Sequence, residues 1–181
     1  MYFIKKGCCV FFVFLILVFL FYLVNSSEIK EFQRWSGLLK DKYESIGFEQ
    51  AVKKVRTWND AESYLLGHLR FDSGQPSSNF ETIHSTGKTV CFGAAIMAKA
   101  LLSDNHDRYE VDLYVYKNKS GSWSHMIALV KDKETGRYGS LGINACDCLT
   151  PGYLKEEEVF NKIKFVFFWK DYKMPEKISS L

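Results

Sequence analysis

The sequence predicts an α+β domain in which helices come first and an antiparallel sheet follows. Three observations predict this class. Residues 28–70 carry apolar side chains at helical spacing, residues 91–102 form a nearly uninterrupted apolar helix, and apolar and polar residues alternate from Tyr109 onward. Helices followed by alternating strands are typical of an α+β fold. A chain of 181 residues has room for one such domain.

An apolar segment precedes the domain. Cys8 to Val24 is a run of 17 apolar residues that follows Lys5 and Lys6. The apolar core of a cleaved signal peptide is usually shorter, about 7 to 15 residues. With its uncharged flanks the run approaches the roughly 20 residues that span a bilayer. We therefore expect residues 1–27 to be an uncleaved membrane anchor, with a cleaved signal segment as the alternative. The protein would cross the membrane once, and residues 28–181 would form a domain outside the cytoplasm.

Charge excludes one class of partner. The chain has 24 Lys and Arg, of which Lys5 and Lys6 belong to residues 1–27, so residues 28–181 hold 22 basic and 21 acidic side chains. Nucleic-acid binding depends on clustered basic residues that neutralise phosphates. This nearly neutral domain has no such cluster, and we expect no nucleic-acid partner.

The helical part is expected in two or three pieces before Arg70, with Phe32 and Trp35 on one apolar stripe and Gly47 as a stop. The segment Asp72–Asn79 (DSGQPSSN) is rich in turn-forming residues and predicts a loop. After it we expect a helix from Cys91 to Leu102 (CFGAAIMAKALL) that is apolar nearly all round. Such a helix packs in the centre of a domain.

Strands are expected after this helix. The composition predicts strands over Tyr109–Lys117, Ser122–Lys131 and Arg137–Ile143, and a fourth over Ile163–Trp169. Along the first of them, Tyr109, Val111, Leu113 and Val115 share one face.

Cys91 is the candidate nucleophile. A cysteine at a helix N-terminus lies among unpaired backbone N–H groups and at the positive end of the helix dipole, and both favour thiolate over thiol. The same N–H groups can stabilise the oxyanion of a tetrahedral intermediate. A lone buried cysteine is more often a packing residue, so the prediction requires a base nearby.

His125 is the candidate base, because it lies on a predicted strand in SWSHMIALV, on the face shared by Trp123, Ile127 and Leu129. His68, His84 and His106 are expected to be surface or capping residues. If the loop Lys133–Gly136 joins the strands as a two- or four-residue turn, paired positions sum to 269 and Asn144 stands opposite His125. Asn144 is then the expected orienting residue of a Cys-His-Asn site, with Asp147 as second choice.

The motifs CFGAAIMAKALL, SHMIALV and RYGSLGIN followed by PGY resemble the transglutaminase-like superfamily, relatives of papain-type cysteine peptidases, over about Phe80 to Tyr153. The resemblance implies that the cysteine attacks an acyl group, the histidine acts as base, and an aspartate or asparagine orients it. The matching positions are Cys91, His125 and Asn144. Met126 and Ile127 replace the aromatic residue often found after the family histidine, and the next strand does not end in Asp-Pro.

The sequence therefore predicts a membrane-tethered, thiol-dependent enzyme that hydrolyses or transfers the acyl group of a protein or peptide substrate, with no cofactor and no metal. Two alternatives stay open: an inactive binding module of the same fold, and a redox protein using Cys146 and Cys148. Two cysteines at C-x-C spacing do not complete a zinc site, although they can form a disulfide in an oxidising compartment.

Overall fold

The computed structural model describes residues 41–74, 79–121, 124–166 and 173–179 of the chain. The predicted anchor, residues 1–27, and the apolar stripe with Phe32 and Trp35 lie outside these ranges. Within them, no helix has the length and apolar character needed to cross a bilayer.

The elements in chain order are α3 (Phe48–Lys54), α4 (Trp58–His68), β1 (Arg70–Phe71), α5 (Phe80–Thr86), β2 (Lys88–Thr89), α6 (Cys91–Leu101), η1 (Ser103–Asn105), β3 (Tyr109–Lys117), β4 (Ser124–Asp132), β5 (Arg137–Leu141), η2 (Ala145–Asp147), β6 (Leu149–Tyr153), α7 (Glu156–Val166) and β7 (Glu176–Lys177).

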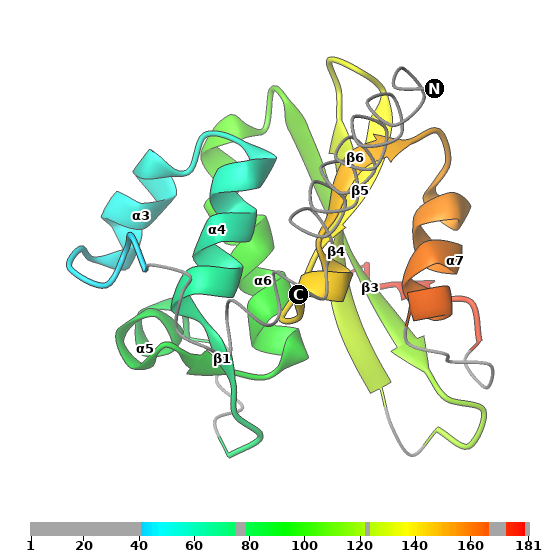
Figure 1. Cartoon of the computed structure of the whole chain (residues 1–181), viewed down its shortest axis with the longest axis horizontal. Helices are drawn as coiled ribbons and strands as arrows, with labels where there is room; N and C mark the ends of the chain where they lie inside the picture. The colour runs from blue at the N-terminus through cyan, green and yellow to red at the C-terminus, as the bar shows by residue number, and fades with distance from the viewer. Residues whose placement is uncertain (1–40, 75–78, 122–123, 167–172, 180–181) are drawn as a thin grey trace, which may run out of the picture.

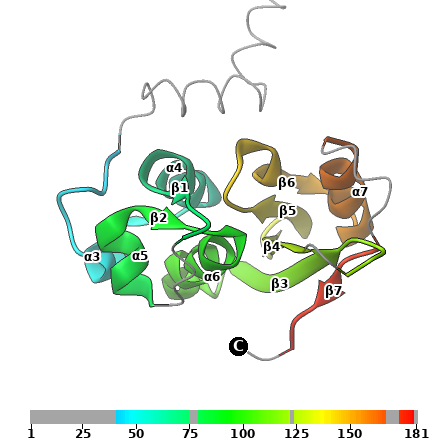
Figure 2. The ribbon, with the colours of Figure 1, turned by 90° about the horizontal axis from the view of Figure 1, so that it is seen from below.

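The main sheet lies between two layers of helices (Figures 1 and 2). Its five strands have the order β6-β5-β4-β3-β7, and every pairing is antiparallel. Helix α6 packs on one face against β4 and β3, with α3, α4 and α5 beyond it, whereas α7 covers the other face. The predicted α+β class with an antiparallel sheet is confirmed. A separate parallel pair, β1 and β2, leads into α6.

Local signals explain where the first helices begin. Thr57 caps α4 in a capping box, in which its hydroxyl accepts from the Asp60 N–H at 3.2 Å while the Asp60 carboxylate accepts from the Thr57 N–H at 3.0 Å. The expectation that Gly47 stops a helix is wrong, because Gly47 is the N-cap residue of α3. Helix α5 was not expected; it begins after Asn79, whose side chain accepts from the Thr82 N–H at 2.9 Å.

Helix α6 is confirmed, ending one residue earlier than expected. Ala94, Ala95 and Ala98 are completely buried. Because their side chains are small, the helix backbone can approach β4 closely. This close packing sets the first residue of α6, Cys91, beside the strand that carries His125.

The predicted register between β4 and β5 is confirmed. Asp132 pairs with Arg137 and Ala128 with Leu141, so the pairing follows the expected sum up to the end of β5. Strand β3 differs from expectation because both of its faces are buried. Its Leu113 faces the core under α6, and Tyr114 and Tyr116 belong to a second core under α7.

The predicted strand Ile163–Trp169 is wrong as far as Val166, since those residues end α7; residues 167–169 lie outside the described ranges. Val159, Phe160 and Ile163 are buried against Tyr114 and Tyr116. Positions i, i+1 and i+4 fall on one side of a helix, which is why this apolar sequence forms a helix over the sheet.

Candidate active site

Cys91 is the first residue of α6 and is half-buried. The first intrahelical bond runs from the Ala94 N–H to the Val90 carbonyl at 3.0 Å, so the N–H groups before Ala94 have no carbonyl partner within the helix. No acidic residue lies in the first turn. The sulfur therefore lies at an electropositive helix terminus, as the sequence predicts.

His125 lies near the start of β4 and is only 4% exposed. Its side chain is hydrogen-bonded to the Cys91 thiol. Packing of α6 on β4 thus brings together the two residues that the sequence names as nucleophile and base.

The third member of the group is Asp147, and not Asn144 as predicted. The Nε2 atom of His125 lies 2.9 Å from Oδ1 of Asp147, which leaves the other ring nitrogen for Cys91. The register is as predicted, but β5 ends at Leu141, before it could extend to Asn144. The chain then turns through η2, and this turn carries Asp147 back to the histidine.

Asp147 is held by hydrogen bonds to its carboxylate and to its backbone carbonyl. The residue is fully buried, and its Oδ2 accepts the Asn144 backbone N–H at 3.1 Å. The Ser140 hydroxyl donates to the Asp147 carbonyl at 2.6 Å. Asn144 donates its backbone N–H to this carboxylate, and in the capping box of η2 its side chain accepts from the Asp147 backbone N–H.

Gly142 was missed by sequence reasoning and completes this turn. A Cβ atom built on it would lie 2.5 Å from the Asp147 Cβ and 2.7 Å from Oδ2. Atoms at such distances overlap, so a side chain at this position would displace the carboxylate. The sequence signal was a glycine just after the strand, three residues before the turn that carries Asp147.

Cys91 and His125 have shifted pKa values because of their neighbours in the site. Burial opposes ionisation of Cys91, but the hydrogen bond and positive charge of His125, with the N–H groups of Met126 and Phe92, outweigh it and lower the pKa of the thiol. Burial likewise opposes the imidazolium, but the charge and hydrogen bond of Asp147, together with Cys91, raise the pKa of His125. Both shifts favour a thiolate-imidazolium pair near neutral pH.

This pair predicts the pH dependence of the thiol. An ordinary cysteine has a pKa of about 8.5, so its alkylation rises only as the pH approaches that value. Because the pKa of Cys91 is lowered, its alkylation by iodoacetamide should already be fast at pH 6 to 7. Mass spectrometry of the folded protein measures this, with half-buried Cys146 as the internal comparison. Equal rates for the two thiols across this range would contradict the ion pair.

Cys146 and Cys148 flank Asp147, and neither forms a disulfide with another cysteine in the described part of the chain. Cys148 is buried, and its Sγ donates to the Gly142 carbonyl at 3.7 Å, so it packs beneath the turn. This position suits a structural role for Cys148 better than disulfide exchange, which requires access.

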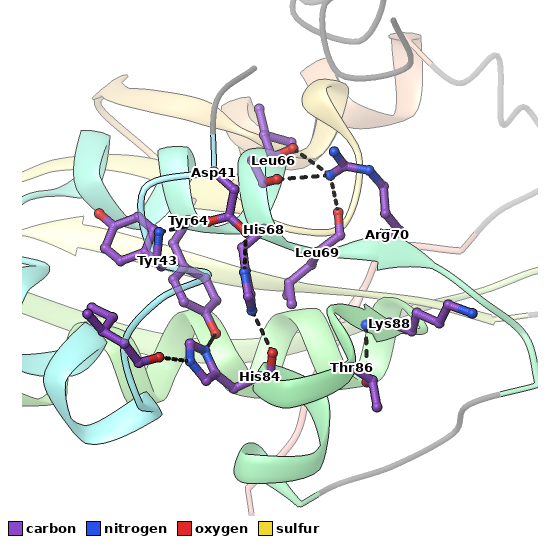
Figure 3. Close-up of polar contacts among 12 residues, drawn as sticks. Asp41, Tyr43, Tyr64, Leu66, His68, Leu69, Arg70, His84, Thr86 and Lys88 are labelled. Carbon is purple, nitrogen blue, oxygen red and sulfur yellow. Dashed lines mark hydrogen bonds and ion pairs between the residues drawn. The ribbon is translucent and has the colours of Figure 1, made fainter. Parts of the chain in front are cut away.

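His68 and His84 were expected to be surface or capping residues, but they do not lie at the surface; they form a cluster with Asp41 and Tyr64 (Figure 3). His68 bonds to the Asp41 carboxylate at 2.6 Å and to the His84 carbonyl at 2.7 Å. His84 bonds to the Tyr64 hydroxyl at 2.7 Å and to the Ile46 carbonyl at 2.6 Å. All four ring nitrogens are engaged, so these histidines join residues 41–46 to α4 and α5. His106 is exposed, in agreement with expectation.

Comparison with known proteins adds no assignment, because no family model and no curated protein matches the chain.

Proposed function

We propose that this domain is a transglutaminase-like, papain-type enzyme that breaks an amide bond through a thioester on Cys91. The observation that carries the proposal is the continuous hydrogen-bonded series from Cys91 through His125 to the buried Asp147. In this proposal the nucleophile, the proton carrier and the orienting carboxylate are three separate residues, as acyl transfer requires.

The reaction would begin when the Cys91 thiolate attacks the acyl carbon, a C–S bond forms, and the carbonyl electrons move to oxygen. The N–H groups at the start of α6, which have no carbonyl partner within the helix, are suited to stabilise this oxyanion. The intermediate would collapse as the C–N bond breaks and the leaving amine takes the proton of the His125 imidazolium. Water or a second amine would then attack the thioester, give its proton to His125, and release the thiolate.

The role of Asp147 in this scheme is to orient His125 and to stabilise its charge. Its bond to Nε2 directs the other ring nitrogen to Cys91. Since the carboxylate is fully buried, its interaction with the imidazolium is only weakly screened by water. We include the apolar residues 1–27 in the proposal as a membrane tether for this domain.

Activated acyl esters test the proposal. After mixing with a p-nitrophenyl acyl ester, the full chain should carry one acyl group on Cys91 that hydroxylamine removes. The Cys91→Ala variant should carry none, whereas Cys146→Ala should behave as wild type. Adding a primary amine then shows whether the acyl group passes to water or to the amine. Folded protein that never acylates Cys91 would contradict the proposal and favour a binding module without activity.

A further inference from the structure

Two histidines hold the segment 41–46, which contains neither helix nor strand and precedes α3. At its start, the Asp41 carboxylate lies 2.6 Å from Nδ1 of His68 on α4. At its end, the Ile46 carbonyl lies 2.6 Å from Nε2 of His84 on α5 (Figure 3). The centroids of the two imidazole rings are 4.6 Å apart. The two rings therefore act as one unit that fastens both ends of the segment to the domain.

The partners of the ring nitrogens determine how many protons this unit holds. A backbone carbonyl can only accept a hydrogen bond, so a ring nitrogen that faces one must carry a hydrogen. This applies to Nε2 of His84, which faces Ile46, and to Nε2 of His68, which lies 2.7 Å from the His84 carbonyl. Nδ1 of His68 faces a carboxylate, which also accepts. The Asp41–His68 pair therefore holds one further proton, as an imidazolium beside a carboxylate.

His84 is neutral in the same arrangement. Its Nδ1 atom lies 2.7 Å from the Tyr64 hydroxyl. Burial, and then the charges of Asp41 and Glu81, raise the pKa of this hydroxyl, so it stays protonated and donates to the imidazole. A proton on Nδ1 would end this acceptance. It would also place a second positive charge beside the first in a site where His84 is only 6% exposed, and burial and a nearby like charge both disfavour that charge.

The surrounding elements do not balance a second charge. Helix α3 contributes the uncharged ring of Phe48. Strand β1 contributes Arg70, whose guanidinium donates to three carbonyls at the end of α4, and β2 contributes Lys88, which pairs with Asp72 at 3.6 Å. Among the described residues, Asp41 is the carboxylate that bonds directly to either ring. One carboxylate balances one imidazolium, and the network is complete with a single charged histidine.

We propose that this cluster is a pH-sensitive latch that holds the segment 41–46 most firmly when one of its two imidazoles, and only one, is charged. After release, both side chains behave as ordinary histidines, which titrate around about pH 6.5. Below that pH, released His84 takes up a proton that the closed latch excludes. Above it, released His68 gives up the proton that the closed latch retains. The latch should therefore open on both sides of about pH 6.5.

This inference is independent of the chemistry proposed for Cys91. The segment connects the domain to the preceding part of the chain, which includes the residues 1–27 proposed as a membrane tether. Opening of the latch would then give the domain more freedom relative to that tether, without a change in the layers that form the site. His125 does not contribute to this response: although burial opposes it, Asp147 and Cys91 raise its pKa to about 10.

Hydrogen exchange of the full chain in detergent, measured by mass spectrometry from pH 5 to 8.5, tests the latch. Rates are corrected for the pH dependence of exchange in an unstructured chain. Protection of peptides that cover residues 41–46 should be greatest near pH 6.5. It should fall by up to about tenfold per pH unit on either side, since opening takes up or releases one proton. Peptides from α6 provide the reference and should keep their protection.

His84→Gln separates the two sides of the profile. Glutamine can donate to the Ile46 carbonyl and accept from Tyr64, but it takes up no proton. The loss of protection at acid pH should disappear, and the loss at alkaline pH should remain. His106→Gln is the matched control, because the side chain of His106 is 78% exposed, and both losses should remain in this variant.

A wild-type profile that is flat from pH 5 to 8.5 would overturn the latch, and this result does not depend on the folding of any variant. An acid-side loss that persists in folded His84→Gln protein would overturn it as well. Neither outcome affects the proposed function, which the acylation of Cys91 tests separately.

Discussion

Replacing Asp147 with asparagine should lower turnover by about 10²- to 10⁴-fold, the range typical of a lost general acid-base function. Asparagine has nearly the same shape but no negative charge. Because that charge raises the pKa of His125, its removal should leave the imidazole neutral near pH 7. Cys91 then loses the imidazolium that lowers its own pKa. Alkylation of Cys91 at neutral pH should fall by at least about tenfold, since one pKa unit is a factor of ten.

Asn144→Ala is the control for this substitution. It removes the side chain, which in the η2 capping box accepts from the Asp147 backbone N–H, but it keeps the backbone N–H that donates to the Asp147 carboxylate at 3.1 Å. We expect turnover and Cys91 alkylation close to wild type, with thermal unfolding showing that both variants are folded. The opposite ranking, in which Asn144→Ala is inactive and Asp147→Asn is active, would restore Asn144 as the orienting residue.

Replacing Gly142 with alanine should produce the second large loss. The new methyl group would overlap Asp147, whose Cβ lies 2.5 Å from its position. Relief of this overlap requires movement of the carboxylate away from His125 or of the turn itself. We expect Cys91 alkylation at neutral pH to fall about tenfold or more, its pH profile to move toward that of an ordinary thiol, and stability to fall by about 1 to 3 kcal/mol.

Gly47→Ala provides the comparison, because a Cβ atom on Gly47 would have nothing within 4 Å. It should leave alkylation unchanged. A combined variant with Asp147→Asn shows whether Gly142 acts through the carboxylate: the losses in alkylation should then be far from additive. A Gly142→Ala protein that is less stable but keeps the wild-type pH profile would make Gly142 a packing residue without influence on the site.

The sequence was sufficient to predict those helices and strand pairings that depend on neighbouring residues. The helix from Cys91 followed from its apolar residues, and the register of β4 with β5 followed from the loop after Asp132, because a hairpin turn determines its pairing. The proximity of Cys91 and His125 could be predicted because an alanine-rich helix and an apolar strand form the centre of such a domain.

The third site residue could not be predicted from the same rules. Extending the register to Asn144 assumed that β5 continues, but pairing stops at Leu141, and a turn of η2 changes the direction of the chain. Beyond Leu141 the chain folds so that Gly142 closely approaches Asp147, a contact that no spacing rule contains. The helical state of residues 156–166 was missed for a similar reason: the face with Phe160 is stabilised by Tyr114 and Tyr116, which lie far away in sequence.

The division of the site between two layers also bears on how the protein acquires its reactivity during folding. His125 and Asp147 come from a hairpin and the turn that follows it, contacts that are local in sequence and can form early. Cys91 belongs to a helix that must dock on this sheet from another layer. Before docking, the thiol has the modest nucleophilicity of any exposed cysteine. We therefore expect the newly made chain to carry no activated thiolate before α6 has docked, and its reactivity to develop with the completed core.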